Sequence, residues 1–272
     1  EDDRRGAGGI AMSETTPLPL RRMTAAVVLF AVALFLAGCA SAPPGEPEVP
    51  AMHTIAEFTD DEYVPEIRDD PWESFNKRMY RFNYNFDKYV FLPVLYGYEF
   101  VTPGFVQTGV SNFFNNVYEI HTFYNSVLQL KWKKAGTTVS RFAINTTIGV
   151  AGLFEVANRW GLKRQDEDFG QTLGYWGVPA GPYVVIPVVG PYTVRSASGY
   201  AVEASLRYVA LDALEPFGDG NEALAIELGV GAVEAINLRR DHKFRYYQSG
   251  SPFEYDLVRF LYQKSQEFRI MK

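Results

Sequence analysis

The only cysteine of the chain, Cys39, is the residue whose neighbours most clearly specify a chemistry. An apolar run at 27–35 and the residues at 36–38 precede it, and Arg21 and Arg22 precede the run. A basic start, a short apolar stretch and small residues at the cleavage point are typical of a secretory signal. The run is too short for a spanning helix, which needs about 20 residues. We therefore expect cleavage before Cys39.

The stretch Leu36-Ala37-Gly38-Cys39 resembles the lipobox of bacterial lipoproteins. This resemblance implies that the Cys39 thiol carries covalent lipid, which is the only bound group we expect. Ala40 follows the cysteine, where an aspartate would imply retention in the inner membrane, so the resemblance favours the outer membrane. We interpret 1–38 as the signal peptide, with residues before Met12 or Met23 as an over-extended start. A buried thiol beside an unrelated apolar segment is the alternative.

Residue patterns typical of catalysis are missing from the sequence. The runs nearest to a G-x-S-x-G elbow, at 109–113 and 196–199, do not fit it. The three histidines, His53, His121 and His242, form no H-E-x-x-H pattern, and no G-x-x-x-x-G-K-[ST] loop occurs. We predict that the chain is not an enzyme and binds no metal, and an esterase with dispersed catalytic residues is a weaker alternative. We expect His121 to lie in the interior or at an interface and His242 at a solvated helix end.

Charge is low in sum and uneven along the chain. The net charge of −6 argues against a nucleic-acid partner and suggests no attraction to anionic lipid heads. Between Lys88 and Lys131 only Glu99 and Glu119 are charged, and 169–194 carries no charge. These segments with little or no charge form either the core of a soluble domain or surfaces that face lipid. Prolines and glycines exclude one continuous helix through the second, so we expect it to pack on protein or line a cavity.

The chain divides by composition into three parts. After the signal, residues 39–69 are rich in proline and acidic residues, which predicts a lipidated, disordered tether. The remaining residues, 70–272, suit a single domain that must hold without disulfides. Within the domain, the run of acidic and basic residues at 163–168 is interpreted as a solvated turn. The alternative is a charged collar at the edge of an apolar surface.

A helix is expected to begin at Asp70-Pro71-Trp72-Glu73, where Asp can cap and Pro fits the first turn. Apolar residues then recur every three or four positions, which predicts one stripe of an amphipathic helix: Trp72, Phe75, Met79, Phe82, Phe86 and Tyr89. Asn76 and Asn83 lie on another line. We interpret the stripe as the core face and the asparagines as solvated. The alternative is a helix that borders a path with one apolar and one polar side.

Further elements are mostly helical. Residues 140–157 predict a helix in which Gly149 and Gly152 indicate close helix approach or a kink. Helices are also expected at 221–237 and 254–268. In the last, the apolar residues should face inward and Arg259, Gln263 and Gln266 outward. The best strand candidate is 183–189, broken by Pro187.

Three blocks of the sequence resemble the MlaA/VacJ outer-membrane lipoproteins. The first, DPWESFNKRMYRFN at 70–83, is similar to D-P-x-E-x-x-N-R-x-M-Y-x-F-N. The second, RFAINTTIGVAGLFEVA at 141–157, has Glu155 where the family usually has aspartate. The third, FGQTLGYWG at 169–177, continues through Gly181-Pro182-Tyr183, Pro187 and Arg195.

The resemblance implies a mainly α fold with little or no sheet, in which short amphipathic helices form a ring around a central channel. It implies a location on the periplasmic side, in the inner leaflet of the outer membrane. Family members withdraw mislocalised phospholipid from the outer leaflet, pass it to a periplasmic lipid-binding protein and work beside trimeric porins, and an inner-membrane ABC transporter completes the route. A scaffolding lipoprotein that binds porin and moves no lipid is the alternative.

The channel interpretation makes several residues candidates for a lipid path. Phe82, Asn83 and Tyr84 are expected near the opening, and Arg195 is a candidate phosphate contact whose alternative role is a structural salt bridge. The other candidates lie in the second and third family blocks: Phe142, Asn145, Gly170, Gly181, Pro182 and Tyr183.

Overall fold

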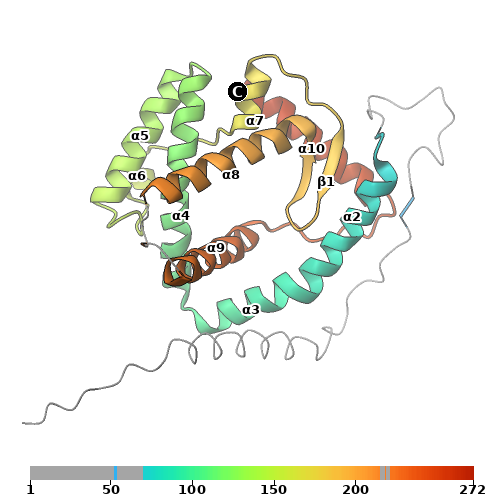
Figure 1. Cartoon of the computed structure of the whole chain (residues 1–272), viewed down its shortest axis with the longest axis horizontal. Helices are drawn as coiled ribbons and strands as arrows, with labels where there is room; N and C mark the ends of the chain where they lie inside the picture. The colour runs from blue at the N-terminus through green and yellow to red at the C-terminus, as the bar shows by residue number, and fades with distance from the viewer. Residues whose placement is uncertain (1–51, 54–69, 215–217, 219–220) are drawn as a thin grey trace, which may run out of the picture. The chain divides into compact units, whose positions relative to one another are not determined.

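The computed structural model describes residues 52, 53, 70–214, 218 and 221–272 (Figure 1). All of them belong to the unit Ala42–Lys272, and the description concerns this unit alone. The signal peptide, Cys39 and nearly all of the tether lie outside the described residues. Within the tether, the His53 amide donates to the Pro252 carbonyl at 3.1 Å, and Met52 packs against the main cluster of buried aromatic rings.

The first described helix continues through a π-helical turn. Helix α2 spans Glu73–Phe86, η2 spans Asp87–Phe91 and α3 spans Leu92–Val101. The helix begins close to the expected place, and the Asp70 carboxylate accepts from the Trp72 amide at 3.1 Å. Glu73 does not reach back toward Asp70 but pairs with Lys77 one turn later, at 2.9 Å.

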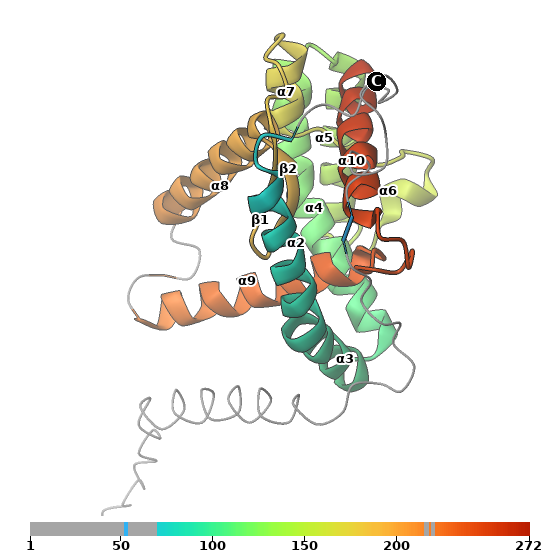
Figure 2. The same ribbon diagram turned by 90° about the vertical axis from the view of Figure 1, so that its right-hand side faces the viewer.

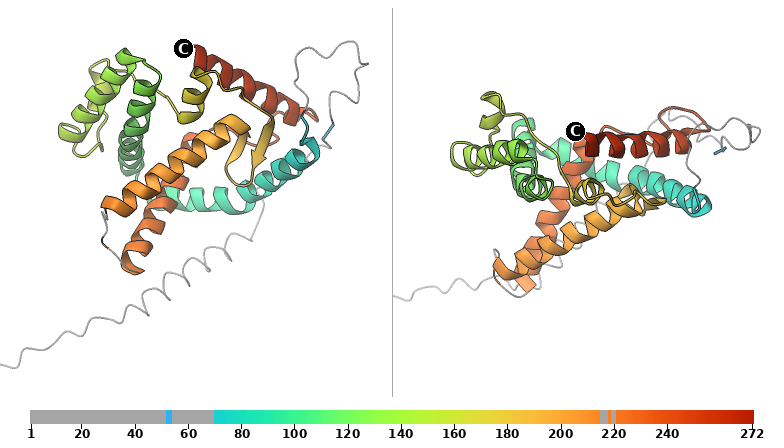
Figure 3. Two further views of the ribbon diagram at one scale, coloured as in Figure 1. Left: turned by 45° about the horizontal axis from the view of Figure 1, so that its top comes forward. Right: turned by 90° about the horizontal axis from the view of Figure 1, so that it is seen from above.

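Helices α4 (Gly104–Leu128) and α5 (Trp132–Thr147) lie side by side (Figures 1 and 3). The helix expected at 140–157 begins earlier and breaks after Thr147, and a short α6 follows at Val156–Arg159. The break is a run of left-handed residues, in which Val150, Ala151 and Gly152 have φ values of 53°, 55° and 89°. A Cβ on Gly152 would lie 2.7 Å from the Asn116 side chain of α4, so both the kink and the close approach are confirmed.

A small hairpin sits between two helices. Helix α7 (Phe169–Tyr175) is followed by the antiparallel strands β1 (Tyr183–Ile186) and β2 (Gly190–Thr193), and α8 (Val194–Leu214) follows directly. Strand β1 confirms the expected strand, which ends before Pro187. Strand β2 was not expected, because its four residues include a glycine and a proline.

The C-terminal helices agree with the sequence, with later ends. Helix α9 spans Asn221–Asp241 and α10 spans Glu254–Met271. The Ser251 hydroxyl accepts from the Phe253 amide at 3.2 Å, as part of the expected start signal. Glu254 does not complete a capping box, since its carboxylate accepts from the Tyr80 hydroxyl at 2.7 Å and from the Ser249 amide at 3.0 Å.

The expected fold class, mainly α with little sheet, is confirmed for the described residues. Contacts between elements form a closed circuit in the order α2, η2, α3, α9, α4, α7, α8, β2 and β1, and β1 returns to α2 (Figures 1 and 2). Helix α10 joins this circuit from α7 and β2. A ring around an opening remains a prediction, because a circuit of contacts fixes the neighbours and not the space between them.

The expected core face of α2 is wrong. Phe75 and Phe82 are 48% and 45% exposed, whereas Asn76 and Asn83 are 0% and 3% exposed. The helical period was correct, but periodicity tells only which residues share a face and not which face meets protein. The polar line of α2 is buried and its aromatic stripe is outside.

The same inversion holds in α10, where the expected orientation is also wrong. Arg259 and Gln266 are buried, whereas Leu257, Phe260 and Leu261 are exposed. Arg259 pairs with Asp256 at 3.1 Å and with Asp70 at 3.6 Å, which satisfies its charge inside the protein. Throughout the described residues, large apolar side chains are frequent outside and polar side chains are frequent inside, the reverse of an ordinary water-soluble domain.

The packing of α7 on α8 gives a stability prediction. A Cβ on Gly199 of α8 would lie 2.7 Å from the Gly170 Cα, so Gly199→Ala should lower the free energy of unfolding by about 1–3 kcal/mol. Gly136→Ala in α5 is the matched control, because nothing lies within 4 Å of its Cβ position. The control should be neutral or stabilising by up to about 1 kcal/mol. Denaturant unfolding in detergent micelles measures both, and equal stability of the two variants would contradict this packing.

Candidate functional site

Two buried asparagine side chains of α2 bind the backbone of the hairpin. The Asn76 amide donates to the Tyr183 carbonyl at 3.0 Å and accepts from the Val185 amide at 2.8 Å. Seven residues further along α2, the Asn83 side-chain amide donates to the Ile186 carbonyl at 3.0 Å and accepts from the Val188 backbone amide at 2.7 Å. Each asparagine thus offers a donor and an acceptor to the strand edge, as a neighbouring strand would.

The spacing of the two asparagines fits the strand. Seven residues of helix advance about 10.5 Å at 1.5 Å per residue. Three residues of strand, from Tyr183 to Ile186, advance about 10 Å at about 3.3 Å per residue. The two elements therefore stay in register over two contacts. A two-stranded hairpin is marginally stable alone, so these contacts with α2 account for its fixed position.

The three candidates at 82–84 point in different directions. Asn83 faces the hairpin, and Phe82 faces outward beside Phe86, with ring centroids 6.1 Å apart. Tyr84 is partly buried against Tyr247, at 4.9 Å between centroids. The sequence therefore located a helix that borders the hairpin, but the structure gives these neighbours separate surroundings.

The candidates of the third family block gather at the base of the hairpin. The Val194 amide donates to the Pro182 carbonyl at 3.0 Å, which closes the base of the hairpin. Next to this bond, Gly181 adopts a left-handed conformation with a φ of 70°. Arg195 is nearly buried, and its guanidinium donates to the Val178 carbonyl at 2.9 Å. Tyr183 is buried, and its ring centroid lies 6.1 Å from that of Tyr255.

Gly170 lies on α7, where a Cβ would approach the Ser196 Cα of α8 to 2.9 Å. Phe142 and Asn145 lie on α5, which packs mainly on α4 and α6 rather than on the hairpin. The Asn145 carbonyl of the side chain accepts from the Ala157 amide at 2.9 Å, which fastens α6 behind the break. Gly170 and Asn145 thus lie at contacts between helices, and Phe142 is a partly buried residue of α5.

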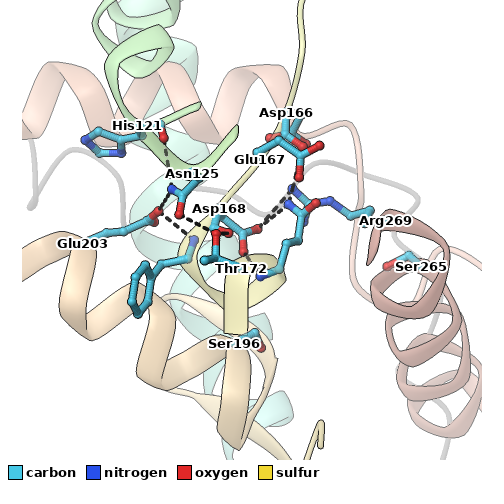
Figure 4. A network of polar contacts seen from close by, with 12 residues as sticks. His121, Asn125, Asp166, Glu167, Asp168, Thr172, Ser196, Glu203, Ser265 and Arg269 are labelled. Atoms are coloured by element: carbon cyan, nitrogen blue, oxygen red, sulfur yellow. Dashed lines mark hydrogen bonds and ion pairs between the residues drawn. The ribbon is translucent and has the colours of Figure 1, made fainter. Parts of the chain in front are cut away.

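A polar network links α4, α7 and α8 (Figure 4). The Asn125 amide donates to the Glu203 carboxylate at 2.8 Å and its carbonyl accepts from the Thr172 hydroxyl at 2.8 Å. The Phe169 amide also donates to Glu203, at 2.9 Å, and Gln129 donates to Thr172 at 3.0 Å. Burial raises the pKa of the Glu203 carboxyl. Sequence reasoning missed this network, because its residues come from three distant segments.

The acidic and basic run at 163–168 is solvated only in part: Lys163, Arg164 and Asp166 are exposed, whereas Glu167 and Asp168 anchor the chain, where the solvated-turn interpretation is wrong. Glu167 is 3% exposed and pairs with Lys131 at 3.2 Å and with Lys134. Asp168 caps α7 by accepting from the Gln171 amide at 2.8 Å. Arg269 of α10 pairs with Asp166 at 2.8 Å (Figure 4).

Two further charge clusters, each with one buried and one partly exposed partner, join neighbouring helices. Arg141 of α5 donates to Glu119 at 2.6 Å and to Glu155 at 2.8 Å, which bridges α4, α5 and the turn before α6. Glu155 is thus the carboxylate that joins the turn before α6 to Arg141. On the other side of α4, Arg207 of α8 donates to Glu234 of α9 at 2.7 Å.

His121 lies next to this second cluster, as the interior interpretation predicts. Its ring is 5.7 Å from the Tyr118 ring and 5.9 Å from the Tyr124 ring, between centroids. Burial lowers the pKa of His121, Arg207 lowers it further and Glu234 raises it. His242 is exposed directly after α9, as expected.

These arrangements position backbone and helices and show no assembled catalytic centre. Among the described residues, no group of three or more histidine, cysteine, aspartate or glutamate side chains could hold a metal ion. The described helices include none that is both long and apolar enough to cross a bilayer. Among the described residues, many large apolar side chains are exposed and many polar side chains are buried and hydrogen-bonded.

The asparagine contacts predict a stability difference on one helix. Asn83→Ala leaves the Ile186 carbonyl and the Val188 amide without this partner, which should lower the free energy of unfolding by about 1–3 kcal/mol. Hydrogen exchange of the Val188 amide should be faster. Asn85→Ala is the control, because Asn85 is exposed on the same helix. A loss of stability in the control as large as in Asn83→Ala would contradict the hairpin contact.

His121 predicts a pH dependence with a definite sign. Because its folded pKa is lowered, the unfolded chain binds more protons, and stability falls as the pH drops below the ordinary value of about 6.5. His121→Gln should lose less stability than the original chain between pH 7.5 and 5.5. His242→Gln should behave like the original chain, because His242 is exposed. Thermal unfolding at both pH values tests this, and an unchanged pH response in His121→Gln would refute it.

Comparison with known proteins gives this geometry a family. The model of the family described as MlaA lipoprotein matches residues 68–269. A Haemophilus influenzae relative, named intermembrane phospholipid transport system lipoprotein MlaA, is 32% identical over 225 residues, which are 81% of this chain and 86% of the relative. The Escherichia coli protein of the same name is 38% identical over 136 residues, 48% of this chain and 54% of the relative.

Other relatives carry no functional name. An uncharacterized protein of Rickettsia prowazekii is 38% identical over 148 residues, which are 53% of this chain and 59% of the relative. The chain thus spans about three fifths of that protein's length.

A solved structure described as "Structural basis for maintenance of bacterial outer membrane lipid asymmetry" is 30% identical, with a TM-score of 0.58. The match covers 75% of this chain and all of the other. Since the family model spans most of the chain and a relative agrees over nearly its full length, this chain belongs to the MlaA lipoprotein family.

Proposed function

We propose that this lipoprotein withdraws mislocalised phospholipid from the outer leaflet of the outer membrane and passes it to a periplasmic lipid carrier, which maintains lipid asymmetry. The observation that carries the proposal is the inverted burial. Aromatic stripes such as Phe75 and Phe82 lie outside, and asparagine, glutamate and arginine side chains lie inside. Water outside would penalise such a surface, whereas hydrocarbon outside would stabilise it.

The physics of the cargo requires two kinds of surface. Exposing one sixteen-carbon tail to water costs on the order of 10 kcal/mol, at about 0.8 kcal/mol per methylene, so the tails need a continuous apolar path. The headgroup needs polar partners along the same path. We place this path through the middle of the closed circuit of elements, as a central amphipathic channel bordered by α2 and the hairpin.

The proposed position is in the inner leaflet of the outer membrane, on its periplasmic side. Lipid on Cys39 anchors the chain, and residues 39–69 form the tether. In the described part of the chain no helix suits a full crossing. A body of this kind lies within one leaflet with its apolar exterior in the acyl chains.

The proposed partners follow from the family. The relatives are named as part of an intermembrane phospholipid transport system, which supports a handover between proteins. We assign the handover to a periplasmic lipid-binding protein and place the chain beside a trimeric porin. The passage needs no catalytic step and no resident cofactor besides the lipid on Cys39.

The candidate residues take distinct roles in this proposal. Asn83, together with Asn76, fixes the hairpin at the border of the channel. Phe82 contacts acyl chains from outside, and Tyr84 lies at the polar flank of the same helix. Gly170, Gly181 and Pro182 allow the close turns that set the hairpin on α8, and Arg195 holds its base.

A deletion strain tests the proposal. Loss of the gene should raise outer-leaflet phosphatidylethanolamine, measured with a membrane-impermeant amine reagent, and the original chain should restore it. Cys39→Ala should fail to restore it at equal expression, because the anchor is lost. Single replacements of Phe82, Asn83 and Tyr84 report on the border of the channel, and wild-type behaviour of all three would remove them from the mechanism.

Purification separates transport from scaffolding. Phospholipid that co-purifies in a fixed ratio with the chain supports transport. A lipid-free preparation that only captures porin would overturn the transport proposal in favour of a scaffold.

A further inference from the structure

Helix α2 and its continuation η2 have a third face besides the buried and the apolar ones. At 100° per residue, the buried line passes through Asn76, Tyr80 and Asn83, and the exposed aromatic stripe lies on one side of it. Arg81 and Lys88 lie on the other side, and the exposed Arg78 lies between Arg81 and the stripe. The helix is therefore apolar along one flank and basic along the other.

The loop between α9 and α10 extends the basic flank. Tyr246 of this loop packs on Tyr80, at 4.9 Å between ring centroids, and Tyr247 packs on Tyr84 at the same distance. Burial raises the pKa of the Tyr247 hydroxyl, and the positive charge of Arg81 nearby acts to lower it. Lys243 and Arg245 precede these tyrosines directly in the loop. We call Arg78, Arg81, Lys88, Lys243 and Arg245 the basic rim.

Two carboxylates of this region, those of Asp87 and Glu254, have partners of their own. Asp87 receives two hydrogen bonds from Arg239, at 2.5 and 2.8 Å. Glu254 is buried and accepts from Tyr80 at 2.7 Å and from Ser249 at 3.0 Å. These partners of the two carboxylates thus lie outside the rim, which brings five basic side chains to a chain whose net charge is −6.

Aromatic rings lie among these cations. The Lys88 Nζ is 5.6 Å from the centroid of the Tyr84 ring and 5.6 Å from that of Tyr89. Tyr89 is exposed beside it, and Phe244 is exposed in the loop between α9 and α10, next to Tyr246. Basic side chains next to exposed aromatic rings are typical of the boundary between acyl chains and headgroups. This neighbourhood favours a lipid over an acidic protein as the partner.

We propose that the basic rim binds the phosphate groups of phospholipids and so sets α2 along the headgroup level, with its apolar flank in the acyl chains. The inference rests on the proposed function and names the surface that meets the headgroups. It also revises the expectation from net charge, because binding depends on the local excess and not on the sum.

The test measures binding of the purified full-length chain in nonionic detergent micelles doped with short-chain phosphatidylglycerol. The variant R78Q/K243Q/R245Q removes three rim charges and should weaken binding on the order of a hundredfold, at about fivefold per charge. The control K133Q/R159Q/K163Q removes three exposed charges elsewhere and should bind like the original. The variant R78K/K243R/R245K keeps the charge and should retain binding, which separates charge from misfolding. Binding should also weaken with added salt.

Three outcomes would contradict the proposal for the basic rim. The control triple variant could weaken lipid binding as much as the rim triple variant does, or the rim triple variant could bind lipid like the original chain. Polyglutamate could also displace the lipid at a lower concentration than phospholipid does. Inorganic phosphate that binds as tightly as phosphatidylglycerol would assign the rim to free phosphate, against the proposal. If the rim triple binds normally and still restores outer-leaflet lipid in cells, only the rim fails. If the original chain binds no phospholipid, the proposed function fails with it.

Discussion

The pairing of two asparagine amides with the edge of a hairpin is the interaction on which the rest of this structure depends. Asn76 and Asn83 can reach the backbone of β1 only if the polar line of α2 faces inward. The aromatic stripe of the same helix must then face outward. Because seven helical residues and three strand residues advance nearly the same distance, both contacts form together. One local match thus sets the orientation of a whole helix and exposes Phe75 and Phe82.

Polar contacts take the part that apolar side chains have in a water-soluble core. Arg141 forms ion pairs with Glu119 and Glu155. Asn125 is hydrogen-bonded to both Glu203 and Thr172. Glu167 forms ion pairs with Lys131 and Lys134. Such contacts are directional and cost much when half-satisfied, so they favour one arrangement of helices. The buried tyrosine cluster around Tyr80 adds packed rings, and the hydroxyls of Tyr80 and Tyr255 donate to Glu254 and Asp70. Directional polar contacts thus fix the arrangement of the interior, and many apolar side chains remain exposed on the surface.

The glycines and the π-helical turn allow helices to follow one another closely around the circuit. Gly199 and Gly170 bring α8 against α7, and the left-handed run that ends at Gly152 turns the chain back toward α4. At the π-helical turn, Asp87 receives Arg239 from α9, which ties the first helical segment to a distant one. These joints connect helices of up to 25 residues, the length of α4, into one closed circuit of contacts. The basic and the apolar flanks lie on the same helix, α2.

The sequence by itself determined which residues share a helix face, where α2, α9 and α10 begin, that a strand ends before Pro187, and that the segment with Gly149 and Gly152 must bend. Those features depend on local periodicity and backbone preferences, which short stretches of sequence contain. It also contained the family blocks that place this chain among the MlaA lipoproteins. Only the tertiary structure decided which face of α2 and α10 is buried, that Glu167 is an anchor, and that Glu203 meets Asn125. The physical reason is that burial depends on distant partners and on the surrounding medium, and neither is written in the spacing of residues along one helix.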